Sequence, residues 1–184
     1  MTEGEVSQVS QNFTTFANLI NEQFVYGAKK YSDKDNASRE TTDILFDTFG
    51  AEWLYGTICK YTFRYDNVHR EKDLLKIATY AYLLWLKRGF FDTPNGSDTA
   101  RDTNVAMKSL YYTSFMEKVM RRGVVAVAPR IESIRHMLMS FVDNWDMISE
   151  NNLTEIFILC FYEWNEKFSH IAGQDSDTNN KDDS

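Results

Sequence analysis

Apolar and polar residues alternate along most of the chain with the period of an α-helix. In the first such segment, about residues 6–31, apolar or small residues recur at spacings of three and four. They are Val9, Phe13, Phe16, Ala17, Ile20, Phe24 and Gly27. No segment competes seriously as a strand, and the chain has only 2 prolines and 8 glycines. The pattern therefore predicts an all-α protein, a bundle of about five to seven long helices.

The following helices are separated by clusters of turn-forming residues. "SDKDNAS" ends the first helix, because Ser, Asn and Asp compete with helical backbone hydrogen bonds, and Ser38 can cap the next one. The pattern then predicts helices over residues 38–65, 70–88, 103–121, 129–147 and from residue 152 onward. Gly50 bends or splits the first of these, and Gly89 suits the end of the second. "GVVAVAP", residues 123–129, reads as a short strand or an extended link.

The size and composition fit one domain. The chain has 184 residues, of which 43% are hydrophobic and 15% aromatic, enough for a core. We expect a single helical domain over residues 1–172, with the candidate site in helices of residues 5–90. The helices of residues 102–172 either complete the same core or form a contact between copies, and a homo-oligomer is expected. Residues 173–184 are acidic and polar, and predict a disordered tail.

The net charge and the length of the apolar runs argue against two classes of partner, nucleic acids and membranes. The net charge of −7 argues against general nucleic-acid binding, which depends on Lys and Arg neutralising phosphates. The longest apolar run, Ile77–Leu86, is too short to cross a membrane, and the first residues lack the pattern of a signal peptide. We therefore expect a soluble, cytoplasmic protein. Cys59 and Cys160 have no metal-binding spacing and are interpreted as buried free thiols.

A narrow line of polar residues interrupts the apolar surfaces of the helices on either side of "DNVH", residues 66–69. A short connection makes consecutive helices antiparallel neighbours. The polar line consists of Gly56, Lys60 and Arg64 on the first helix and Asp73, Lys76 and Tyr80 on the second. Gly56, without a side chain, leaves room for a ligand or another backbone.

Two interpretations of the polar line are open. Lys60 and Asp73 can form an ordinary ion pair between the helices, because buried charges need partners. Alternatively, Lys60, Arg64 and Lys76 hold phosphate oxygens through charge-assisted hydrogen bonds. Asp73, with Glu71, would then orient Lys60 or hold Mg²⁺ through oxygen ligands.

A second basic cluster ends the first helix, in "YGAKKYSDKD". Its lysines are Lys29, Lys30 and Lys34. They either complement the helix dipole or border the same pocket, with Lys30 as a further phosphate contact. The chain has no GxxxxGK[ST] sequence, which excludes a P-loop kinase.

"YGTICKYTFR", a turn and then "EKDLLKIATY" resemble a pattern of the P-loop-less nucleotide kinase family of short-tailed coliphages. The matching positions are Gly56, Lys60, Tyr61, Arg64, Glu71, Lys72, Asp73, Leu74, Lys76 and Tyr80. The resemblance implies phosphorylation of nucleoside monophosphates, with a nucleotide as the small-molecule partner. For a viral protein it also implies the cytoplasm of the host cell.

The order of "NEQFVYGAKKY", "KYTFR" and "REKDLLKIATYA" is also similar to MazG-like all-α NTP pyrophosphohydrolases, over about residues 16–86. That resemblance implies a MazG-like antiparallel core and a Mg²⁺ site. The chain departs from that family at the metal-binding residues, since Lys76 replaces an Asp and Thr79 an Asn. No ExxE pair is evident in the preceding helix, because Tyr55 follows Glu52 at the required spacing.

Three functions remain open from the sequence. The most specific is a nucleoside monophosphate kinase, in which Asp73 and Lys76 are the candidate catalytic residues and Asp73 and Glu71 the candidate Mg²⁺ ligands. The second is a dNTP pyrophosphohydrolase with an altered metal site. The third is a non-catalytic nucleotide-binding or helical interaction protein. The first two make the protein an enzyme, which the resemblances favour.

Overall fold

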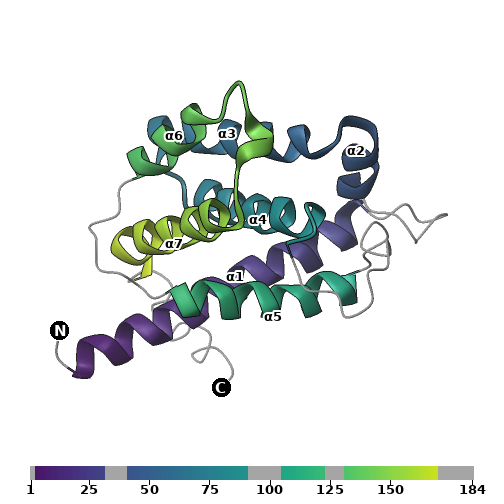
Figure 1. The fold of residues 1–184 in the computed structure, drawn as a ribbon. Coiled ribbons are helices and arrows are strands. Elements are labelled where there is room, and N and C mark those ends of the chain that lie inside the picture. Colours follow the sequence, from purple (N-terminus) through teal and green to yellow (C-terminus); the bar gives the residue numbers. More distant parts are fainter. Residues whose placement is uncertain (1–2, 32–40, 91–104, 123–130, 170–184) are drawn as a thin grey trace, which may run out of the picture.

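The computed structural model describes residues 3–31, 41–90, 105–122 and 131–169, and every regular element in these ranges is helical (Figure 1). The elements are α1 (Glu3–Tyr31), α2 (Thr41–Phe49), α3 (Ala51–Val68), α4 (Glu71–Lys87), α5 (Val105–Arg122), α6 (Ile131–Ser140), the short 3-10 helix η2 (Trp145–Met147) and α7 (Glu150–Lys167). The prediction of an all-α protein is confirmed. Within these ranges, no helix combines the length and apolar content needed to cross a lipid bilayer.

Helix α4 lies at the centre of the bundle. It contacts α3, α7, α1 and α5, and Figure 1 shows α3 and α6 on one side of it and α1 and α5 on the other. A helix that is apolar on nearly all sides needs neighbours on all sides. Between Asp73 and Leu86, every residue of α4 is buried except Lys76 and Tyr80. Within this stretch of α4, Lys76 and Tyr80 of the polar line are therefore the residues that reach the surface.

Helix α7 completes the core around α4 and α1. The Phe16 ring of α1 is fully buried and packs against Phe157, Phe161 and Trp164 of α7, with ring centroids 5.4–5.8 Å apart. Helix α5 adds Phe115 to the same buried cluster. Of the two roles considered for the C-terminal helices, completion of the core is therefore the one that the structure describes.

The helix boundaries agree with the prediction at Gly50 and differ from it elsewhere. Gly50 splits the second predicted helix into α2 and α3, one of the two outcomes expected for it, and its φ of +72° is a conformation that suits glycine. The predicted helix over residues 129–147 ends as α6 at Ser140 and is followed by a turn and η2. Helix α7 begins two residues before Asn152, because Ser149 and Asn152 form a capping box.

Several predictions fall outside the described residues. These are the link at residues 123–129, most of the loop at residues 89–102 and the acidic tail at residues 173–184.

Candidate functional site

The polar line lies on a helical hairpin with a tight connection. Helix α3 continues to Val68, so only His69 and Arg70 separate it from α4. His69 takes a left-handed conformation with φ of +49°, and its N–H donates to the Tyr65 carbonyl at 2.8 Å. This geometry ends α3 and turns the chain back along it. The connection predicted over residues 66–69 is thus partly helical, which shifts the pairing of the two helices by about one turn.

Asp73 is the most buried polar residue of the line, with 0% of its surface exposed. Arg64 Nε lies 3.0 Å from both of its carboxylate oxygens, and Arg64 Nη2 donates to Oδ1. Arg70 Nε donates to Oδ2 at 3.3 Å. The expected Lys60–Asp73 pair is therefore wrong: in the described residues, two arginines neutralise Asp73. The hydrogen bond to Asp73 also raises the pKa of Arg64, which stays charged.

Three aromatic residues continue from the Arg64–Asp73 ion pair along the α3–α4 hairpin. The Arg64 guanidinium lies 4.8 Å from the centroid of the Tyr61 ring, a cation–π distance. Tyr61 stacks on Tyr80, with centroids 6.0 Å apart and planes at 18°, and Trp53 packs edge-on against Tyr80 at 5.8 Å. Tyr61 thus contacts both Arg64 and Tyr80, and it links the Asp73–Arg64 ion pair to the aromatic residues of the hairpin.

Lys76 lies on α4 between Asp73 and Tyr80. Spacings of three and four place it on the same face of α4 as Asp73 and Tyr80, which are joined through Arg64 and Tyr61. Its side chain is half-buried. Among the described residues, none forms an ion pair or hydrogen bond with its ammonium group. Lys60, exposed on α3, has its ammonium 5.5 Å from the Tyr61 centroid.

The two carboxylates proposed as Mg²⁺ ligands do not form a metal site in the structure. Glu71 accepts a hydrogen bond from Trp164 Nε1 at 2.7 Å, and residues two apart on a helix do not share a face. Asp73 is occupied by guanidinium donors. No group of three or more potential ligands occurs in the part of the chain that the structure describes. These two residues therefore do not fit Mg²⁺.

Three further positions were singled out in the sequence: Gly56, Lys30 and Thr79. Gly56 is exposed, and an added Cβ would meet no atom within 4 Å, so no close approach within the chain explains it. The side chain of Lys30 lies outside the described residues. Thr79, at the second departure from the MazG pattern, is buried and donates to the Leu75 carbonyl at 2.6 Å.

Sequence reasoning missed two contributors to the site. Arg70 precedes α4 and reaches Asp73 at a spacing of three, a signal that the spacing rule for helices contains. Trp53 is the other, and its contact with Tyr80 depends on the packing of α3 against α4.

Comparisons with known proteins yield no relative. No family model matches the chain, and no curated protein and no solved structure matches it. The resemblances to nucleotide kinases and to MazG-like enzymes therefore stay predictions from the residues quoted above.

Proposed function

We propose that the polar line on α3 and α4 binds the phosphate groups of a nucleotide and that the protein phosphorylates nucleoside monophosphates. Lys76 is the observation that carries the proposal. Lys76 is half-buried and its ammonium group has no partner among the described residues, on a helix in which every other residue from Asp73 to Leu86 except Tyr80 is buried. Partial burial removes water from a charge. A phosphate oxygen is an acceptor that would compensate for this loss.

The neighbouring cations support a phosphate ligand. Lys60 contributes a second ammonium group from α3, and Arg64 is 40% exposed while Asp73 holds it in place. A guanidinium that is already fixed loses little conformational freedom when its remaining donors bind an anion. Together the three side chains can offset part of the charge of a phosphate group, although Asp73 already balances one of the three positive charges.

Phosphoryl transfer depends mainly on such positioning and charge neutralisation. In the proposed reaction, an oxygen of the monophosphate attacks the γ-phosphorus of a nucleoside triphosphate, and the bond to the bridging oxygen breaks. Lys60, Lys76 and Arg64 would stabilise the charge on the transferred group. The role of Asp73 in this proposal is to hold Arg64, because both of its oxygens already accept hydrogen bonds.

The contacts of Asp73 also support a second candidate, a nucleotide-binding protein without catalysis. A pyrophosphohydrolase of the MazG type has less support, because metal-assisted hydrolysis needs several carboxylates around the metal. The described residues contain no such cluster.

One experiment separates the candidates. The full chain is incubated with each dNMP plus ATP, and separately with each dNTP, in buffer with magnesium, and the products are resolved by anion-exchange chromatography. New nucleoside diphosphates support the kinase. Monophosphate and pyrophosphate from a dNTP would overturn it in favour of the hydrolase. No turnover with a nucleotide-dependent thermal shift would leave the binding protein, and neither turnover nor shift would overturn nucleotide binding itself.

A further inference from the structure

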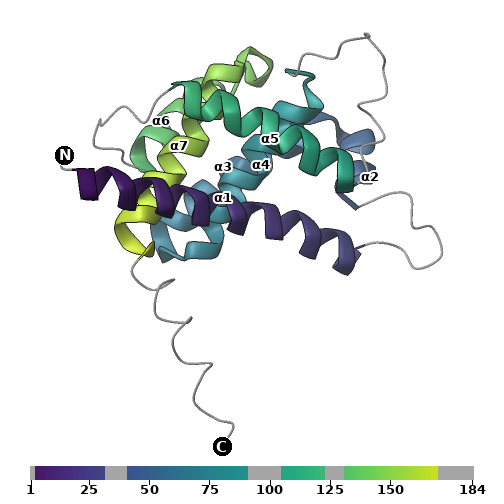
Figure 2. The ribbon, with the colours of Figure 1, turned by 90° about the horizontal axis from the view of Figure 1, so that it is seen from below.

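The face of the molecule formed by α1 and α5 has an uncharged strip along α1. From Val6 to Asn21, the chain contains no Asp, Glu, Lys, Arg or His, although 26% of all residues are Asp, Glu, Lys or Arg. Much of this segment is exposed. Its exposed polar residues are Ser7, Gln8, Ser10, Gln11, Thr14, Thr15 and Asn18. Figure 2 shows α1 and α5 side by side on this face of the bundle.

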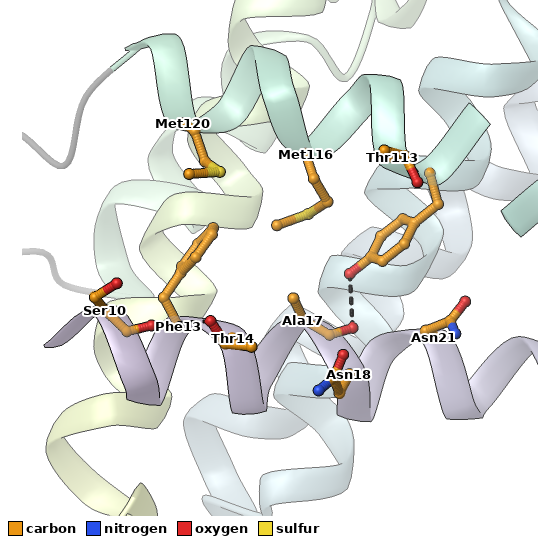
Figure 3. A pocket seen from close by; sticks show the side chains of 10 residues that line it. Ser10, Phe13, Thr14, Ala17, Asn18, Asn21, Thr113, Met116 and Met120 are labelled. Atoms are coloured by element: carbon orange, nitrogen blue, oxygen red, sulfur yellow. Dashed lines mark hydrogen bonds between the residues drawn. The ribbon is translucent and has the colours of Figure 1, made fainter. Parts of the chain in front are cut away.

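A pocket of about 350 Å³ lies between the two helices, and its ten lining residues carry no charge. Figure 3 shows Phe13 of α1 rising toward Met116 and Met120 of α5, with Ser10 and Thr14 along the α1 edge. Two apolar side chains of this face are strongly exposed: Val6 by 51% and Met120 by 64%. Aromatic and methionine side chains surrounded by uncharged polar groups resemble the composition of the centre of a protein interface.

We propose that this α1–α5 face, made of the residues of the segment 6–21 that are not buried, with Thr113, Met116 and Met120, binds a second copy of the same chain. In a two-fold contact the same patch faces itself, so any charged residue near the axis meets its own charge. The chain has a net charge of −7, but residues 6–21 of α1 contribute no charge to this repulsion. Hydroxyl and amide side chains both donate and accept hydrogen bonds, so a patch rich in them is complementary to itself.

The dimensions of the face indicate a weak dimer. Residues 6–21 of a helix span about 24 Å at 1.5 Å per residue, and two packed helices present a width of roughly 20 Å. The product is roughly 500 Å² per copy, or about 1,000 Å² in total, near the lower limit for specific interfaces. In an antiparallel pairing of two α1 helices, Thr14 lies near the two-fold axis. The α1–α5 face lies across α4 from α3 (Figure 1), so the dimer leaves the polar line accessible.

Sedimentation velocity of the full chain, from low micromolar to several hundred micromolar concentration, tests this proposal. We expect a monomer–dimer equilibrium that tightens with added salt, because salt screens the repulsion between two acidic chains. A monomer at every concentration would overturn the proposal, whether or not a small molecule occupies the pocket. A dimer that weakens with salt would also overturn it, since this dependence indicates an interface of ion pairs.

A matched pair of variants locates the interface. Thr14→Asp places two carboxylates near the axis and is expected to weaken dimerisation at least tenfold. Thr48→Asp is the control, because Thr48 is also exposed and its hydroxyl also donates to a carbonyl four residues earlier, but it lies on α2. Met120→Glu, on α5, tests the same face through a second helix. Dimerisation that survives both Thr14→Asp and Met120→Glu, or that Thr48→Asp weakens equally, contradicts the assignment.

Discussion

Replacement of Asp73 by asparagine tests whether Asp73, at the centre of the polar line, stabilises the packing of α3 against α4. The change preserves the volume of the side chain but removes its charge. It also turns one oxygen, which accepts hydrogen bonds from arginine, into an N–H₂ group that faces arginine donors in a site with 0% exposure. Loss of a hydrogen bond between charged groups and burial of an unsatisfied donor each cost about 1–3 kcal/mol. We expect the free energy of unfolding to fall by about 3 kcal/mol, a decrease in Tm of roughly 6–12 °C.

Urea denaturation followed by far-UV circular dichroism measures this change. Asp66→Asn is the matched control on α3, because Asp66 pairs with the exposed Arg135 at 3.5 Å and such pairs contribute at most about 1 kcal/mol. If Asp73→Asn lowers the free energy of unfolding by no more than Asp66→Asn does, Asp73 does not stabilise the α3–α4 hairpin. Asp73 would then regain its place as a candidate for catalysis or metal binding.

Two further predictions concern the core and the pH dependence. Phe16→Ala removes a ring that packs on three aromatic side chains of α7, and we expect a loss of about 3–5 kcal/mol in urea denaturation; a loss below 1 kcal/mol would contradict the packing. Burial favours a higher pKa for Glu150, but hydrogen bonds from Lys118 and Trp85 outweigh it and lower the pKa. The stabilisation from Glu150 is therefore present above the ordinary glutamate pKa of about 4.3 and is lost as the pH falls through the lower folded value. We expect the stability difference between wild type and Glu150→Gln to shrink over that range, and a constant difference would refute this reasoning.

The sequence predicted α4 well because polar residues interrupt a long apolar segment at spacings of three and four, at Asp73, Lys76 and Tyr80. It did not predict the end of α6 at Ser140. Beyond that point, Trp145 donates from its indole nitrogen to Glu52 of α3 at 3.0 Å. Such a contact between distant segments favours the turn over a continued helix, and local periodicity does not contain it.

The sequence also identified the residues of the polar line on both helices, but not which residue of α3 lies opposite which residue of α4. Helix α3 extends to Val68 through residues that resemble a loop, and three more helical residues move Arg64, instead of Lys60, opposite Asp73. Lys76 has no ion-pair or hydrogen-bond partner among the described residues. The pairing of charges thus depends on the length of one connection, which composition alone does not determine.

Isothermal titration of ATP and of each dNMP into the wild type, Lys76→Ala and Lys72→Ala tests the central claim most directly. Lys72 is an exposed lysine one turn earlier on α4 and lies outside the proposed site. The account predicts that a nucleotide binds the wild type and that Lys76→Ala weakens binding at least tenfold, about 1.4 kcal/mol, whereas Lys72→Ala changes it little. Equal affinity of Lys76→Ala and the wild type, or no binding of any of these nucleotides, would contradict it.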